Sequence, residues 1–402
     1  MPTIRRHLAS AAAAAVVTLA CSGVASAREE FVLLLRDGSV KAVSVLEMRD
    51  GMIIHDFAGR PESVPIADVL AAVQWRSGSR QSPMIRPILR RELGLLRMRD
   101  GQHFPGTVAR EPSEDPDVLS WVHPQLGRQN LPIEDIASVL FRVAEAPGEI
   151  ELSGGDRVVL RNGDRLDGFI MSIGAEVVVQ QEDASGDVRD VNVPLRRVAG
   201  LRLVADAAEP GDRRMWFDEG TVLDIDDLTA PAASSISVSR PGSGTPITLE
   251  GIDLEDVAAI VFDMDALVPL AALPVERIEP LDGRYRAEAP QLLQPRVAAQ
   301  LGAVTLTGPA SVTWTLPEPN GRFLADVTIP EGARDWADLE FVVLDGREER
   351  MRVRLNRANP SAPIDVRMAS SDRRLTIRLE TGRHGAVQDR VELTLARVQY
   401  EG

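Results

Sequence analysis

Few residues of this chain combine a type and a spacing that support catalysis. Hydrolytic or metal chemistry needs imidazoles, thiols or carboxylates that converge on one point. Four histidines follow the N-terminal region, each in a different part of the chain: His55, His103, His123 and His384. None has the close spacing of a metal-binding pair. The sequence also lacks a Gly-x-Ser-x-Gly nucleophile motif and a phosphate-binding loop with its lysine. We therefore expect no enzyme activity, no metal and no cofactor.

Two short acidic clusters offer the oxygen ligands that Ca²⁺ prefers. The first contains Asp224, Asp226 and Asp227, and the second contains Asp263 and Asp265. Neither matches the spacing of a calcium-binding loop with its central glycine. We interpret both clusters as solvated carboxylates in turns.

Sugar binding needs an exposed aromatic ring that stacks on a pyranose and charged groups that hydrogen-bond its hydroxyls. Aromatic residues make up only 4% of the chain, so such rings are scarce. Trp336 is the best candidate, because it lies in a polar segment between two predicted strands. Arg334, Asp335 and Asp338 lie beside it and complete the set of candidate glycan contacts. The alternative is that Trp336 caps the end of a sheet.

The other aromatic and charged candidates have simpler interpretations. Trp314 falls on the apolar phase of a predicted strand, so we expect it in a core. Tryptophans expected to fill smaller cores are Trp75, Trp121 and Trp216. Five closely spaced arginines predict a basic face that would meet an acidic polymer or be solvated: Arg347, Arg350, Arg352, Arg354 and Arg357. Asp389 is expected to hold its loop through backbone hydrogen bonds.

The elements around these residues follow a pattern that occurs four times. A short apolar run ends in a turn dipeptide whose second residue is glycine: Asp37-Gly38, Asp100-Gly101, Asn162-Gly163 and Glu219-Gly220. A second signature follows each turn, namely proline, an aliphatic residue and a short apolar strand, at 65–75, 132–141 and 194–203. Its fourth copy, 254–262, lacks the proline. Arrays of one small unit bind partners more often than they catalyse.

The third unit shows its predicted elements most clearly. We expect strands at 158–160, 166–173, 177–179, 191–193 and 201–203, a helical turn over 194–198, and a bend or bulge at Gly168. Five strands with one helical turn resemble small SH3-like or Sm-like barrels. Nucleic-acid binding is not expected, because many carboxylates surround the unit. So small a unit needs burial against its neighbours, either four in a row or two pairs.

The pattern changes after Phe262. Residues 266–295 are rich in proline and are expected to be irregular, and 230–245 in the fourth unit is expected to be an exposed loop. A series of alternating apolar and polar residues then predicts strands around 312–316, 323–329, 339–343, 351–355, 364–368, 375–379 and 391–395. Seven or more such strands with Gly and Pro turns predict an antiparallel sandwich or jelly roll.

This last region resembles a known family. The resemblance rests on strand motifs such as 302–306, 311–314, 321–323, 339–346, 364–366, 375–377 and 388–390. Together they are similar to the NPCBM domain, the novel putative carbohydrate-binding module, a jelly roll found in exported bacterial proteins. The resemblance implies a sugar-binding role. The chain departs from the family before Trp314, where it has 307–310 in place of a segment with glycine and histidine. It also keeps only Asp389 of an aspartate-histidine pair that precedes a tryptophan.

The predicted fold class is therefore all-β, with tandem small SH3-like barrel units followed by an antiparallel β-sandwich. We place the signal peptide at 1–27, the units at 28–80, 92–145, 150–206 and 212–265, and the NPCBM-like sandwich at 266–402. Linkers are expected at 77–91 and 144–148.

The N-terminus predicts export. Arg5, Arg6 and a short apolar stretch precede a small-x-small site that ends at Ala27, as in a cleaved signal peptide. The alternative is a lipid anchor at Cys21, where Leu19-Ala20-Cys21 resembles a lipoprotein cleavage box. Either way no cysteine pair is available for an internal disulfide. We expect a secreted or periplasmic protein without a transmembrane span.

Two hypotheses of function follow. The formal net charge of −15, with scattered arginines, argues against nucleic acid as a partner. The first hypothesis is a non-catalytic envelope protein that acts as a scaffold or interaction module and binds an envelope protein. The second is a carbohydrate-binding protein that recognises a cell-surface or extracellular polysaccharide through its C-terminal jelly roll.

Overall fold

The structure is a computed structural model of the 402-residue chain. It describes residues 30–57, 60–75, 92–111, 113–143, 150, 155–182, 186–204, 206–232, 235–239, 247–249, 254–283, 286–292 and 301–400. The predicted signal peptide, Cys21 and most of the two predicted linkers lie outside these residues.

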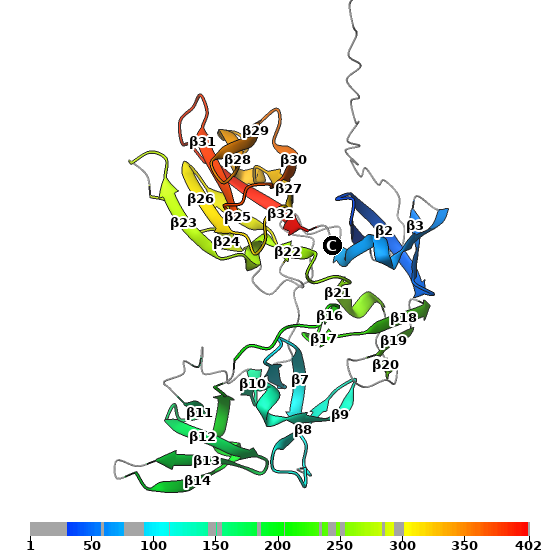
Figure 1. The fold of residues 1–402 in the computed structure, drawn as a ribbon, viewed down its shortest axis with the longest axis vertical. Coiled ribbons are helices and arrows are strands. Elements are labelled where there is room, and N and C mark those ends of the chain that lie inside the picture. The colour runs from blue at the N-terminus through cyan, green and yellow to red at the C-terminus, as the bar shows by residue number, and fades with distance from the viewer. Residues whose placement is uncertain are drawn as a thin grey trace, which may run out of the picture.

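The all-β prediction is confirmed. The described chain consists of antiparallel strands and single turns of 3-10 helix (Figure 1). None of the described helices is long and apolar enough to cross a membrane.

The first three units share one order of five strands, with a 3-10 turn before the last. Unit 1 contains β1 Glu30–Leu35, β2 Val40–Arg49, β3 Met52–Phe57, β4 Arg60–Pro65, η1 Ile66–Asp68 and β5 Val69–Trp75. Unit 2 contains β6 Gly94–Met98, β7 His103–Val108, β8 Val118–His123, β9 Gly127–Pro132, η2 Ile133–Asp135 and β10 Ile136–Leu140. Unit 3 contains β11 Asp156–Leu160, β12 Arg165–Ile173, β13 Glu176–Glu182, β14 Val188–Pro194, η4 Leu195–Arg197 and β15 Val198–Arg202.

Unit 4 divides its strands differently. It contains β16 Arg214–Phe217, β17 Val222–Asp224, β18 Asp227–Ala232, β19 Ser235–Ser239, β20 Ile247–Leu249, η5 Leu254–Asp256 and β21 Val257–Val261. The expectation of an exposed loop at 230–245 is wrong for β18 and β19. Ile236 and Val238 alternate with serines and are fully buried, and Ala230 pairs with Met48 of β2. Two branched residues at a period of two outweigh the turn-like composition around them.

The glycine of each signature turn adopts a left-handed conformation. The φ angles are 87° at Gly38, 87° at Gly101, 91° at Gly163 and 102° at Gly220. Side chains rarely adopt this region, which explains the glycine in every copy. Gly168 has a different role: a Cβ there would lie 2.4 Å from the carbonyl oxygen of Gln180. The register shift of β12 lies between Ile170 and Ser172, so the bulge is not at Gly168 itself.

The units form two pairs, which settles the two arrangements left open by the sequence. The closing strand β5 of unit 1 pairs with β21 of unit 4, and β10 of unit 2 pairs with β15 of unit 3 (Figure 1). Ala72 lies opposite Ile260, and Val139 lies opposite Leu201. Each of these four residues occupies the same position after its 3-10 turn. The two pairs therefore share one pseudo-twofold arrangement.

A polar joint connects the two pairs. Strand β17 of unit 4 meets β7 of unit 2, where Val222 lies opposite His103. Beside it the buried guanidinium of Arg214 donates to both oxygens of Asp224, at 2.5 and 3.0 Å. Burial lowers the pKa of His103 to about 4, with the charges of Arg97 and Arg214 adding to the effect. His103 is thus neutral at pH 7.

A second buried chain of hydrogen bonds crosses the same joint. His123 Nδ1 accepts the backbone N–H groups of Gln125 and Leu126, so the proton of the neutral ring lies on Nε2. That nitrogen donates to Thr221 Oγ1 at 2.7 Å, and the hydroxyl donates to the Glu219 carboxylate at 2.5 Å. Burial raises the pKa of Glu219. Because Thr221 is buried, this network joins units and does not present a nucleophile.

The C-terminal region is a sandwich of two antiparallel sheets. One has the order β23-β26-β31-β28-β29, and the other has β24-β25-β32-β27-β30 with β22 beside β32. The elements are β22 Leu267–Pro269, η6 Leu270–Ala272, β23 Val275–Pro280, β24 Gln291–Leu292, β25 Val304–Thr307, β26 Ala310–Thr315, β27 Arg322–Thr328, η8 Glu331–Ala333, β28 Asp338–Asp345, β29 Glu348–Asn356, β30 Ser361–Arg367, β31 Arg374–Thr381 and β32 Arg390–Gln399. Trp314 is buried in its core with Phe323 and Phe341. The irregular structure expected over 266–295 is thus interrupted by β22, β23 and β24.

The sandwich lies against the outer face of the first unit pair. An apolar cluster joins the three modules: Val32, Leu34, Ala71, Val73, Ala258, Ala259, Val261, Leu267, Leu301 and Leu395. In the second pair, Arg97, Ser138 and Arg202 replace Leu34, Ala71 and Val261. An apolar face requires a partner to bury it, whereas these polar residues do not. The apolar composition of this sheet face therefore determines that the sandwich packs on the first unit pair and not on the second.

We predict that Asp224→Ala lowers the free energy of unfolding by about 3 kcal/mol or more, because it leaves Arg214 buried without its carboxylate. The control is Glu279→Ala in the sandwich, where Arg277 and Glu279 form an ion pair at 2.5 Å but both side chains are exposed, at 66% and 46%. That change should cost about 1 kcal/mol or less. Urea unfolding measures both, and equal losses would contradict the role given to the polar joint.

Candidate functional site

The candidate site lies at one end of the sandwich, where three loops meet. They are 329–337 between β27 and β28, 357–360 between β29 and β30, and 382–389 between β31 and β32. The sequence places glycine, proline or charged residues in each, so none continues as a strand. Short strands that end together bring these loops to one edge.

Trp336 is the most exposed large hydrophobic residue at this end. Its side chain is 64% exposed, although its backbone N–H donates to the carbonyl of Ala333 and both neighbours Ala333 and Ala337 are buried. The loop is therefore anchored while the indole stays in solvent. Such a ring can stack on a flat apolar surface without first losing other contacts.

The other predicted contacts have unequal surroundings. Asp335 is exposed and lies 3.6 Å from Arg357, so this ion pair lies at the residue before Trp336 in the chain. Arg334 is partly buried and donates from Nε to the carbonyl of Ile329, which braces its own loop. Asp338 is buried. Of the four residues, Trp336 and Asp335 are thus exposed, Arg334 braces its loop, and Asp338 is buried beneath it.

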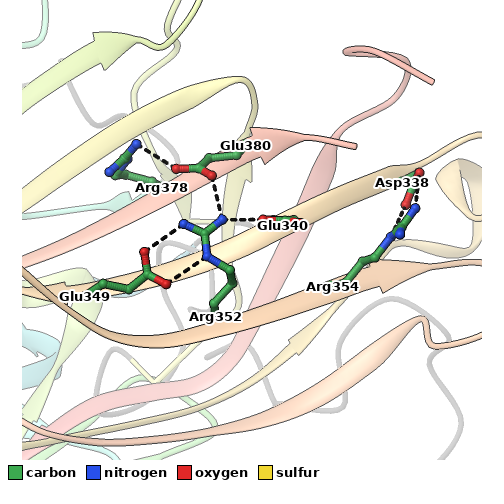
Figure 2. Close-up of polar contacts among 7 residues, drawn as sticks. All are labelled: Asp338, Glu340, Glu349, Arg352, Arg354, Arg378 and Glu380. Atoms are coloured by element: carbon green, nitrogen blue, oxygen red, sulfur yellow. Dashed lines mark hydrogen bonds and ion pairs between the residues drawn. The ribbon is translucent and has the colours of Figure 1, made fainter. Parts of the chain in front are cut away.

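Asp338 holds the loops together. Arg354 donates to both of its oxygens, at 2.8 and 2.7 Å (Figure 2). The backbone N–H of Arg383 donates to one of them at 2.8 Å. The hydrogen bonds from Arg354 are the main reason that the pKa of Asp338 is lowered. A Cβ on Gly382 would lie 2.3 Å from the Asp338 carbonyl, so the third loop packs directly on the start of β28.

Asp389 lies beside Asp338 and has no comparable partners. It is 3% exposed, and among the described residues its side-chain oxygens have no well-formed hydrogen bond beyond a weak contact with the backbone of Asp338. Only its backbone carbonyl bonds the loop, by accepting the N–H of Gly308 at 2.7 Å. Burial raises the pKa of Asp389 to about 7, and the charge of Asp338 adds to the effect. Asp389 thus holds its loop through the hydrogen bond of its own backbone carbonyl.

The arginines of the β28–β29 hairpin do not form a basic face. Arg352 contacts Glu340, Glu349 and Glu380, and Arg378 also pairs with Glu380 (Figure 2). Similar pairs are Arg350 with Asp345 and Glu348, Arg354 with Asp338, and Arg357 with Asp335. Carboxylates on adjacent strands neutralise the positive charge, so the face is not suited to an acidic polymer.

Sequence analysis missed two Arg–Asp pairs and one buried hydrogen-bond network in the units. Arg214 with Asp224 and Arg157 with Asp167 share a spacing, six residues before and four after the turn glycine. Aligning the units on that glycine reveals both pairs. The network of His123, Thr221 and Glu219 has no such signal, because its residues come from two units. In the described residues no group of three or more His, Cys, Asp or Glu is arranged so that it could hold a metal ion.

Comparison with known proteins gives only distant likenesses. No family model and no curated protein matches the chain. Among solved structures, it is similar to the CBM51 module of Clostridium perfringens GH95 in complex with methyl-galactose, with 13% identity over 33% of this chain and 99% of that one, at a TM-score of 0.26. Tandem CBM51 modules of a family 98 glycoside hydrolase from Streptococcus pneumoniae share 11% identity over 92% of this chain and 88% of theirs, at 0.27. The M60 catalytic domain with two CBM51 domains of Clostridium perfringens ZmpB shares 10% identity over 94% of this chain and 55% of that one, at 0.27. Likeness at this level identifies no ligand and no activity for this chain.

We predict that the free energy of unfolding of Asp389→Asn, relative to that of the wild type, increases as pH rises. The folded pKa near 7 lies above the ordinary value of 3.8, so the folded wild type holds a proton that the unfolded chain releases. Its stability should therefore fall between these two values, whereas asparagine stays neutral. Thermal unfolding at about pH 5 and pH 8 should show the difference growing by about 1–3 kcal/mol. Asp335→Asn at the same end is the exposed control, and a difference that does not vary with pH would contradict the prediction.

Proposed function

We propose that this chain is an exported, non-catalytic carbohydrate-binding protein whose site lies on the loops around Trp336. The observation that carries the proposal is the exposed indole on an anchored loop, with the exposed ion pair of Asp335 and Arg357 at the preceding residue. An aromatic platform beside groups that hydrogen-bond hydroxyls is suited to a pyranose ring. The sequence resemblance of the sandwich to the NPCBM domain supports the same class of ligand.

The residues beneath the Trp336 loop fit a sugar-binding role. Asp338, Arg354 and the 382–383 backbone fix the loops from below, so the ring would lose little conformational freedom on binding. One exposed aromatic ring gives a shallow surface and not an enclosing pocket. We therefore expect recognition of an extended or repeated glycan, in which many weak contacts add up.

A scaffold role is the second candidate. The observation that favours it is the direct strand pairing between units, which makes the four units one frame. A frame of this kind would hold the sandwich at a fixed place in the cell envelope and bind an envelope protein. The two roles are compatible, and they differ in what Trp336 does.

We predict that Trp336→Ala weakens binding of the full chain to immobilised, protease-treated cell-envelope polysaccharide at least tenfold, about 1.4 kcal/mol, without lowering stability. Trp336→Phe should keep part of the affinity, because it keeps a ring. The matched control is Phe169→Ala, which removes an aromatic side chain that is 62% exposed in unit 3. Unchanged binding by Trp336→Ala, or an equal loss by Phe169→Ala, would sink the proposed site. Capture that protease abolishes would favour the scaffold role.

A further inference from the structure

Two of the four signature turns bind an arginine from another module. Arg322 of the sandwich donates from Nη1 to the carbonyl of Asp37 at 2.5 Å. Arg214 of unit 4 donates from Nη2 to the carbonyl of Asp100 at 2.7 Å. In both cases the acceptor is the residue directly before the turn glycine. The same turn thus serves twice as a docking point between modules.

The glycine makes room for the guanidinium. A Cβ on Gly38 would lie 2.6 Å from Nη1 of Arg322, and one on Gly101 would lie 3.0 Å from Nη1 of Arg214. A side chain at either position would collide with the arginine or displace it. The glycine therefore permits both the turn conformation and the contact.

An aspartate on the adjacent strand holds each of these arginines. Asp365 accepts from Nε and Nη2 of Arg322 at 2.7 and 2.6 Å. Asp224 accepts from the same two nitrogens of Arg214 at 2.5 and 3.0 Å. A bidentate pair fixes the guanidinium plane and neutralises its charge before it docks. We call an arginine held in this way an arginine fork.

The turn of unit 3 has the same geometry but no fork. Gly163 donates to the carbonyl of Leu160 at 2.9 Å, as Gly38 and Gly101 do to their equivalents at 3.0 and 3.1 Å. Nothing lies within 4 Å of the position that a Cβ on Gly163 would occupy, and residues 161–165 are exposed. No described residue donates to the carbonyl of Asn162. This docking point is formed and open.

The positive charge around the Asn162-Gly163 turn favours the binding of an arginine fork that has carboxylates beside it. Arg165, Arg196 and Arg197 are exposed near it and outnumber the carboxylate of Asp164 in the turn itself. The position of Arg197 is taken by Asp68, Asp135 and Asp256 in the other units. A bare arginine would be repelled by this rim, whereas an arginine in an acidic surround would be attracted.

The chain itself carries a suitable fork on the exposed face of the sandwich. Arg374 donates from Nε and Nη2 to Glu276 at 2.8 and 2.6 Å, and its Nη1 has no hydrogen bond among the described residues. Asp372 adds negative charge beside it. The Arg374 side chain is 51% exposed. Unit 3 and the sandwich lie at opposite ends of the molecule (Figure 1), so this fork cannot reach the turn of its own chain.

We propose that the Asn162-Gly163 turn of unit 3 binds the Arg374–Glu276 fork of a second copy, so that copies associate head to tail. The contact repeats between chains the docking that Arg214 and Arg322 make within one chain. Because the turn and the fork are different surfaces, two bound copies leave a free turn at one end and a free fork at the other. Further copies can therefore add at both ends.

Sedimentation velocity of the full chain over a range of concentrations tests the first half of the contact. The wild type should sediment faster as concentration rises, and Gly163→Asn should weaken this association tenfold or more, because its side chain covers the turn. The matched control is Gly127→Asn, another exposed glycine with positive φ and nothing within 4 Å of its Cβ position, which should associate as the wild type does. A wild type that stays monomeric, or association that Gly163→Asn leaves unchanged, overturns the proposal.

Mixing two variants tests the direction of the contact. Arg374→Gln loses the fork and keeps the turn, whereas Gly163→Asn loses the turn and keeps the fork. Each alone should be monomeric, and an equimolar mixture should form dimers and nothing longer. Added salt should weaken these dimers, since the contact is partly electrostatic. Association of Arg374→Gln alone, or a mixture without dimers, overturns the head-to-tail arrangement.

Discussion

Everything else in the N-terminal region depends on the antiparallel pairing of closing strands. A unit of about fifty residues without disulfide or metal buries too little apolar surface to be stable alone. Pairing β5 with β21 and β10 with β15 satisfies two exposed strand edges at once and joins neighbouring cores. Each closing strand has one edge left for pairing with another unit. When the middle two units pair with each other, the first unit therefore pairs with the last, and one pair is nested inside the other along the chain.

The joint with the sandwich and the joint between the two unit pairs are held by different physical interactions. The first pair has an apolar outer face and binds the sandwich, whereas the joint between the pairs is built from Arg214, Asp224 and His123. Buried ion pairs add little net stability, but they penalise every arrangement in which one partner is left alone. The polar joint therefore fixes which unit meets which, and the apolar face supplies the burial.

Much of the fold could be predicted from the sequence, since it depends on local patterns. In unit 3 the alternation of branched residues and the Asn162-Gly163 turn located all five strands to within a few residues. Trp314 was predicted in the core for the same reason. Local pattern failed at Ile236 and Val238, where a serine-rich segment gains its burial from unit 1. It also gave no way to choose between a row and two pairs, because that choice is made by contacts between residues far apart in sequence.

In the candidate site too, some features follow from local sequence and others depend on contacts between distant residues. Sequence analysis singled out Trp336 but left open that it caps the end of a sheet, and the structure shows that its side chain is 64% exposed. The roles of Asp338 and Asp389 could not be predicted, since both carboxylates precede a strand and look alike in sequence. What distinguishes them is Arg354 on the neighbouring strand, which donates to Asp338 and leaves Asp389 buried with a raised pKa. A single arginine on one strand therefore decides which carboxylate braces the loops and which one remains able to change its charge near neutral pH.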